Sequence, residues 1–262
     1  MADLDGREPE SIQHVAANRG AGVDAASPVL FHPLTTCLLA GLAAGLLAFG
    51  LGEMSYDAYK AKLVPTNLMG SISMLPSAAT QEVATIKNSV LAYAELGAML
   101  GLYLGLAGGL VRKSALGAGI GGVLGLILGG ALGAVLPLAT FPVFFRAIDQ
   151  LEVDPIVIGL GLHIVVWGLL GGAAGLAFAY ALGKPRRMLH YFVLGFIGAA
   201  LGTGVFEAVG GILYPLAKTD QPLATAWKAR LLARMLVSIG AAAAIGLSFP
   251  RTRRSAAPTI RA

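Results

Sequence analysis

The amino-acid sequence predicts an all-α integral membrane protein with six transmembrane helices and glycine-zipper packing. The chain is 56% hydrophobic and only 13% charged, whereas a soluble domain carries about 25% charged residues. Six apolar segments reach the roughly 20 residues that a helix needs to cross a bilayer. Glycines also recur at a spacing of four inside these segments. A soluble helical protein, the alternative class, would need amphipathic helices, and such faces occur only in 53–88 and 214–228.

The predicted spans divide the chain into one membrane domain and two tails. The spans lie at about 33–52, 89–111, 115–139, 156–182, 188–213 and 229–249. We predict a flexible cytoplasmic N-terminal tail at 1–30, a transmembrane domain at 31–250 and a basic cytoplasmic tail at 251–262. The first tail contains no apolar run that could offset the entropy lost when a chain becomes ordered.

Basic residues predict that both termini are cytoplasmic. Lysine and arginine bias short loops toward the cytoplasm. The turns after the second and fourth spans, together with the C-terminal tail, contain nine basic residues and no acidic residue. The expected location is therefore the cell membrane, with the lipid bilayer as the main partner. The basic residues also suit contact with anionic headgroups, so the net charge of +5 does not indicate a nucleic-acid partner.

The segment 115–134, ALGAGIGGVLGLILGGALGA, shows the glycine spacing most clearly. Lipid tails are as apolar as leucine, so helices in a bilayer associate mainly through close packing and hydrogen bonds. Residues four apart lie almost above one another on a helix, and glycine at each of them leaves a smooth stripe. The predicted helix-packing residues are Gly97, Gly101, Gly105, Gly117, Gly121, Gly125, Gly129 and Gly133. Such stripes fit tight static packing, or a pore or sliding interface.

A threefold internal pattern suggests three tandem helix hairpins. In the odd-numbered spans GLAAGLLAFG, GVLGLILGG and GAALGTGVF overlay, and in the even-numbered spans GLAGGLVRK, GLAFAYALGKPRR and GLSFPRTRR overlay. Hairpins joined in this way would be parallel repeats about an axis along the membrane normal, an arrangement found in transporters. The alternative is chance similarity between glycine-rich segments.

Four ionisable residues lie inside the predicted spans at similar depth toward the outer side: Glu95, His163, Glu207 and Arg234. Such a side chain costs about 2.5–3.5 kcal/mol near the bilayer centre, so it needs a partner or a purpose. In the structural interpretation, Arg234 pairs with Glu207 or Glu95. In the functional interpretation, Glu207 titrates beside His163 in a proton or anion site. Tyr93, His163 and Arg234 occupy one position of the repeat alignment.

The longest loop, at 53–88, is expected on the outer side. Tyr56, Tyr59, Leu63 and Val64 suit a short helix at the membrane surface, because tyrosines favour the headgroup region. This loop would either cap the outer face or serve as a flexible connector.

The sequence predicts transport or permeation of a small solute or ion. We expect no enzymatic activity and no cofactor, because no catalytic motif is present. We also expect no metal site, because no second histidine or cysteine lies at ligand spacing from His163. The alternative function is a non-catalytic membrane scaffold, whose glycine-rich faces bind a partner or a second copy of the chain. A cavity that reaches the polar layer favours transport, and an outward-facing glycine stripe favours the scaffold.

Overall fold

Six long helices form the protein in a computed structural model that describes residues 32–150, 154–219 and 221–249. The predicted tails, 1–30 and 251–262, lie outside these residues. The helices are α2 (Pro33–Met54), α3 (Ala78–Val111), α4 (Ala115–Gln150), α5 (Pro155–Ala181), α6 (Met188–Leu213) and α7 (Trp227–Leu247). Each is long and apolar enough to cross a membrane. The prediction of an all-helical membrane domain with six helices able to cross a bilayer is confirmed in this respect.

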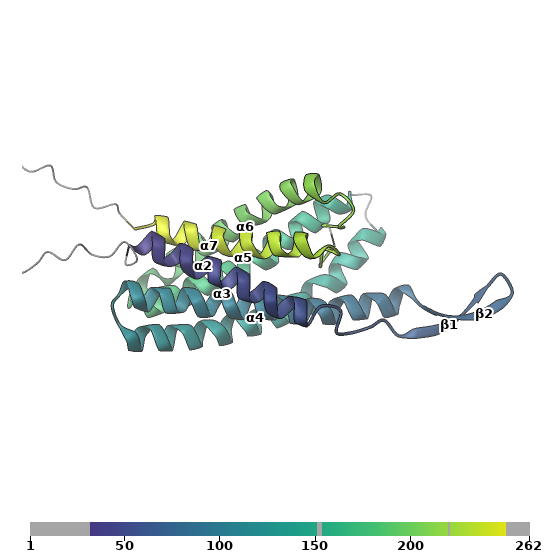
Figure 1. Ribbon diagram of the computed structural model, residues 1–262, viewed down its shortest axis with the longest axis horizontal. Helices are drawn as coiled ribbons and strands as arrows, with labels where there is room; N and C mark the ends of the chain where they lie inside the picture. Colours follow the sequence, from purple (N-terminus) through teal and green to yellow (C-terminus); the bar gives the residue numbers. More distant parts are fainter. Residues whose placement is uncertain (1–31, 151–153, 220, 250–262) are drawn as a thin grey trace, which may run out of the picture.

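The helices form one closed bundle. Each helix packs against the next one in the chain, and the last helix, α7, packs against the first, α2. Figure 1 shows α2 beginning and α7 ending at the same end of the bundle, which we call the terminal end. A thin β-hairpin projects from the opposite end, the hairpin end. Within their most apolar stretches α3, α5 and α7 are 50% buried, whereas α2, α4 and α6 are between 28% and 33% buried. The helices α3, α5 and α7 therefore contribute most of the buried interior.

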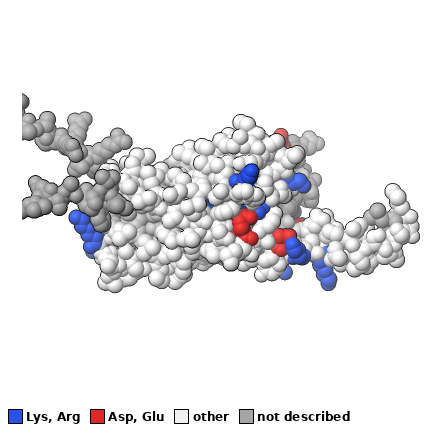
Figure 2. Space-filling model, viewed as in Figure 1, with Lys and Arg blue, Asp and Glu red and all other residues white. Residues whose placement is uncertain are grey.

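On the face shown in Figure 2, the charged side chains lie in two groups. Basic residues lie at the terminal end, residues of both signs lie toward the hairpin end, and a wide band between them shows no charge. The turns at 112–114 and 182–187 lie at the terminal end and contain basic residues but no acidic residue. An apolar band bounded by charges on both sides is the surface that a bilayer requires.

Glycines bring the backbones of α3 and α4 into direct contact. The facing pairs are Gly97 with Gly129, Gly101 with Gly125, and Gly105 with Gly121. A Cβ atom added at any α3 member of these pairs would overlap the backbone carbonyl of its α4 partner. Gly133 faces the backbone of Tyr93 in the same way, whereas Gly117 lies near Ala181 of α5. Contact through backbone atoms extends over roughly four helical turns.

The helix ends carry local stop and start signals. The Ser77 side chain accepts a hydrogen bond from Thr80 N at 3.3 Å, which caps the start of α3. Asp154 caps α5 in the same way through Ile156 N at 2.9 Å. After α5 the chain turns at Gly183, whose φ of +74° favours glycine. These caps place the polar chain ends outside the apolar band.

The segment 53–88 departs from the prediction. The short helix expected around Tyr56–Val64 is wrong, because β1 (Leu63–Leu68) pairs antiparallel with β2 (Ser71–Pro76). Between them Met69 and Gly70 have φ of 51° and 89°; two consecutive positive values form the tight turn that matches strand twist. The following helix, α3, begins at Ala78 rather than near 89.

The segment before the hairpin is attached to the first turns of α3. Tyr59 N donates to Asn88 Oδ1 at 2.9 Å, and Asn88 Nδ2 donates back to Tyr59 O at 2.9 Å. Lys87 lies 5.5 Å from the centroid of the Tyr59 ring, a cation–π contact. These contacts hold the chain between α2 and β1 against α3.

Candidate functional site

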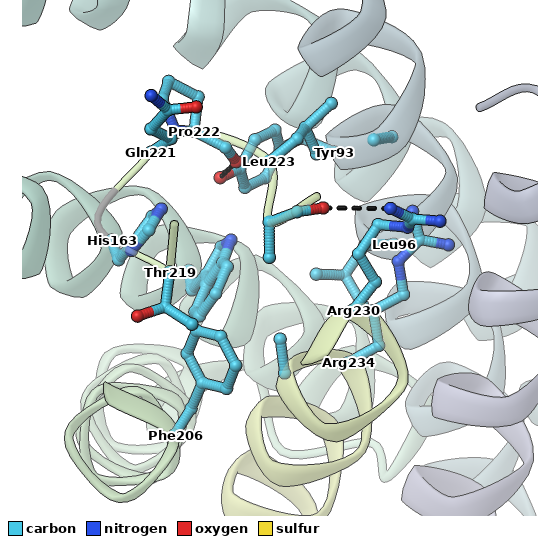
Figure 3. A pocket seen from close by; sticks show the side chains of 14 residues that line it. Tyr93, Leu96, His163, Phe206, Thr219, Gln221, Pro222, Leu223, Arg230 and Arg234 are labelled. Carbon is cyan, nitrogen blue, oxygen red and sulfur yellow. Dashed lines mark hydrogen bonds between the residues drawn. The ribbon is translucent and has the colours of Figure 1, made fainter. Parts of the chain in front are cut away.

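A small cavity lies near the hairpin end, beneath the segment that joins α6 to α7. Its volume, measured as the space open to the centre of a water molecule, is about 30 Å³. The walls come from α3, α5, α6, α7 and this connecting segment (Figure 3). The side chains that matter most are Tyr93, His163, Trp167, Phe206, Pro222 and Arg234. Two of the four predicted polar-layer residues, His163 and Arg234, therefore face one cavity.

His163 and Glu207 form a contact between α5 and α6. Their Nδ1 and Oε1 atoms lie 2.6 Å apart, and their side chains are only 2% and 10% exposed. The His163 ring also stacks on Trp167, with centroids 4.5 Å apart and an interplanar angle of 8°. The pair that the functional interpretation placed together is present, and the stacked indole fixes the orientation of the imidazole.

Arg234 lies on the α7 side of the cavity and points toward α2. Among the described residues it forms an ion pair with neither Glu207 nor Glu95, so the direct pair of the structural interpretation is not formed. Its guanidinium instead donates to the carbonyl oxygen of Ala48. The guanidinium occupies the space in which a Cβ atom of Gly52 would lie.

Glu95 lies on α3 and takes no part in the contact between His163 and Glu207. Its Oε2 atom is buried and has no hydrogen-bond partner among the described residues. Of the four predicted residues, His163 and Glu207 therefore form a hydrogen-bonded pair between α5 and α6. Within the described ranges, Glu95 on α3 and Arg234 on α7 form no ion pair with each other.

Arg230 and Glu53 form an ion pair that the sequence did not reveal. Arg230 Nε and Nη2 donate to the two Glu53 carboxylate oxygens, both at 2.7 Å, which is the strong bidentate geometry. Arg230 Nη1 also donates to Ala224 O at 2.9 Å and to Thr225 O at 2.8 Å. The guanidinium lies 3.6 Å above the Tyr56 ring. One arginine thus connects α7, the end of α2 and the segment above the cavity.

Tyr93 holds the same connecting segment from the other side. Its hydroxyl donates to Pro222 O at 2.7 Å, and its ring is 2% exposed. Tyr93 also contacts Trp167 and Phe141, with centroid distances of 6.2 Å and 5.7 Å. The roof of the cavity is therefore fixed by hydrogen bonds from α3 and from α7.

Replacing Tyr93 with phenylalanine is expected to loosen this roof while leaving the bundle folded. One hydrogen bond is lost and a buried carbonyl oxygen loses its donor, a cost of about 1–3 kcal/mol. Hydrogen–deuterium exchange should rise in 221–226, and the melting temperature should fall slightly. Tyr180→Phe is the matched control, because Tyr180 is 48% exposed. Unchanged exchange in Tyr93→Phe would show that the hydrogen bond does not hold the segment.

The fold and the cavity together define a polytopic membrane protein with a closed six-helix bundle and a buried polar pair near one end. Comparisons with protein-family models, curated proteins and solved structures find no match to this chain. Across the described ranges, no cluster of three or more histidine, cysteine or acidic residues is arranged to hold a metal ion. Any functional conclusion therefore rests on the residues of the site itself.

Proposed function

We propose that the protein transports a small solute or ion across the cell membrane, and that it does so without catalysis. The observation that carries this proposal is the His163–Glu207 contact beside a cavity inside the apolar bundle. Buried ionisable groups are costly in a membrane and typically mark substrate or proton pathways. A purely structural bundle would be more stable with apolar residues at both positions.

The alternative function, a scaffold that binds through glycine stripes, has less support. In the α3–α4 stripe the glycines contact the neighbouring helix, so they are not available to a partner. Glycines with no neighbouring atom within 4 Å of an added Cβ do exist on the helices, at Gly50, Gly119, Gly161, Gly204 and Gly211. None of these five lies four residues from another. They therefore do not form a stripe like the one in 115–134.

The arrangement fits an occluded state of a transporter. Pro222 and the residues that follow it cover the cavity toward the hairpin end. Toward the terminal end the interior is filled by Leu100, Val166 and Leu170, each 0% exposed. Access from either side would require helices to move, and glycine-lined contacts present few side chains that interlock. In this proposal the glycine-zipper packing between α3 and α4 is a smooth interface along which the two helices can move.

Three tandem hairpins would account for the position of the site. Tyr93, His163 and Arg234 come from one position of the repeat alignment, and all three line the cavity. They lie on α3, α5 and α7, the three more buried helices. An axis through the cavity and along the membrane normal would relate these helices, as in transporters built from parallel repeats.

Two helix interfaces support this proposal of repeats. Gly175 of α5 faces Tyr191 of α6, and Gly246 faces Leu34 of α2. In the repeat alignment, Gly175 corresponds to Gly246 and Tyr191 corresponds to Leu34, so the two contacts are equivalent. The third interface, between α3 and α4, does not keep this register. A repeat of three hairpins with one displaced helix is the arrangement that these contacts favour.

We also propose that the terminal end faces the cytoplasm. The support comes from the exposed basic residues of the turns at 112–114 and 182–187, because positive charge near span ends favours the cytoplasmic side. The cavity and the β-hairpin would then lie toward the outer side. A substrate would meet the segment that joins α6 to α7 before it reached His163.

Flux through proteoliposomes tests the proposed function. Purified protein would be reconstituted and assayed with a panel of small cations, anions and uncharged solutes, with empty vesicles as the baseline. We expect flux of at least one solute, and a several-fold loss of that flux in Glu207→Gln and His163→Gln. Glu82→Gln and His190→Gln are matched controls, because Glu82 and His190 do not line the cavity. Absence of flux for the whole panel would overturn the proposal of transport, and the scaffold would then be the remaining candidate function.

A further inference from the structure

Two buried ring nitrogens in the cavity wall have no hydrogen-bond partner. They are His163 Nε2 and Trp167 Nε1, on side chains that are 1% and 6% exposed, and within the described part of the chain neither makes a hydrogen bond of ordinary geometry. Trp167 Nε1 lies toward the Tyr93 hydroxyl without forming a hydrogen bond of ordinary geometry. Buried polar atoms in proteins are almost always hydrogen-bonded, often to an ordered small molecule.

The two nitrogens belong to one wall because their rings are stacked. The centroids of His163 and Trp167 lie 4.5 Å apart and the rings are nearly parallel. Figure 3 shows the His163 ring at the edge of the open space below Gln221 and Pro222. A single small group in the cavity could therefore contact both nitrogens.

The hydrogen-bonding chemistry of this wall favours a hydroxyl group. The Trp167 Nε1–H group only donates. His163 Nε2 accepts when Nδ1 donates to an ionised Glu207, and it donates when the pair holds a second proton. A hydroxyl both donates and accepts, so it satisfies the wall in either protonation state. The Tyr93 oxygen, which already donates its proton to Pro222 O, can accept a further hydrogen bond.

The charges around the cavity favour an uncharged occupant. The two arginines on the cavity wall already have partners elsewhere: Arg230 pairs with Glu53, and Arg234 donates to Ala48 O on α2. Glu207, behind the wall, contacts His163, and Glu95 does not line the cavity. An ion that entered would therefore find no unengaged counter-charge among the lining residues. The remaining walls include Leu96 and Phe206, which cannot replace the water lost by an ion.

The size of the cavity limits the occupant to very few heavy atoms. A water molecule needs about 10–15 Å³ of space measured at its centre, and the cavity offers about 30 Å³. We propose that the cavity binds the hydroxyl group of a small uncharged molecule, water or a short alcohol, against the ring nitrogens of His163 and Trp167. This inference rests on the proposed function and names the class of its substrate.

The two tryptophans of the chain allow a direct test of binding. In protein labelled with ¹⁵N, the indole signals of Trp167 and Trp227 are assigned by comparison with Trp227→Phe. Methanol is the probe. We expect it to shift the Trp167 signal saturably and to leave Trp227, which is 53% exposed, without a saturable shift. Ala233→Leu, which fills the cavity from α7, should abolish the saturable shift, and His190→Gln should preserve it.

Permeability measurements separate water from alcohols and from ions. Osmotic water permeability of proteoliposomes should exceed that of empty vesicles and fall several-fold in Ala233→Leu. Water permeability with no methanol shift identifies water as the occupant, and both signals together extend the class to short alcohols. Flux confined to ions, without either signal, would overturn this inference but leave the proposed transport intact. A methanol shift without flux of any solute would retain the binding site and overturn transport.

Discussion

Replacing Gly101 with leucine is expected to separate α3 from α4 and to lower the stability of the folded protein strongly. Even the Cβ atom of a residue at this position would overlap the Gly125 carbonyl group. An overpacked core typically loses about 1–3 kcal/mol for extra methylenes that neighbouring side chains can accommodate. Here the obstacle is backbone, so the helices must move apart. The contacts between α3 and α4 would then be lost over several turns.

A graded series of variants measures this effect. Gly101→Ala should lower the melting temperature, although alanine favours the helix over glycine by about 1 kcal/mol, and Gly101→Leu should lower it further. Gly119→Ala and Gly119→Leu are the matched controls on α4, because an added Cβ at Gly119 meets no atom within 4 Å. Equal melting temperatures for Gly101→Leu and Gly119→Leu would show that α3 and α4 do not approach through these glycines.

Replacing Arg230 with methionine should produce the second large loss of stability. The substitution leaves Glu53 without its partner and removes the donors to Ala224 O and Thr225 O. Breaking a buried ion pair typically costs about 3–5 kcal/mol. Because the Glu53 side chain is 27% exposed, water can solvate its carboxylate in part. We therefore expect a loss near the lower end of that range.

A double-mutant cycle isolates the pair from the other contacts of Arg230. Glu53→Met alone leaves the guanidinium with its carbonyl acceptors, and the double variant Arg230→Met/Glu53→Met removes both charges. The loss in the double variant should be smaller than the sum of the two single losses. Lys228→Met is the matched control, since Lys228 is exposed on the same helix. A strictly additive cycle would mean that the two charges do not stabilise each other.

Much of the bundle is predictable from the sequence because the bilayer imposes strong physical limits. Six apolar stretches of sufficient length predict six spans, and their boundaries at the terminal end, at Val111, Ala115 and Met188, agree with the structure. The boundaries at the hairpin end differ more. Both α3 and α4 continue well beyond their apolar stretches, in polar or proline-containing sequence where hydropathy gives no signal. Pro137 and Pro142 lie inside α4 although prolines usually end helices.

The hairpin was missed because its strands carry little of the usual pattern. Pro65 lies within β1, although proline is uncommon inside strands. Both strands belong to a two-stranded sheet with no core on either face, so the alternation of buried and exposed residues is weak. The turn at Met69 and Gly70 has only one glycine where two residues require positive φ.

The candidate site was predictable in part. The rarity of ionisable residues in the spans identified His163 and Glu207, which the structure brings together. It could not identify the acceptor of Arg234, because a backbone carbonyl has no signature in the sequence. Glu53 and Arg230 lie at opposite ends of the membrane domain in the sequence, and both fall at the edge of a span. Charges at span edges are common, so neither one indicated its partner.

The contact between Gly52 and Arg234 links two positions that are far apart in the chain. The guanidinium of Arg234 fills the volume that any side chain at position 52 would need. The glycine at position 52 and the long side chain at position 234 therefore depend on each other. In related sequences these two positions should change together: a larger residue at 52 should accompany a shorter one at 234. Natural variation of this kind would identify homologues that retain the charge in the bundle and homologues that have lost it.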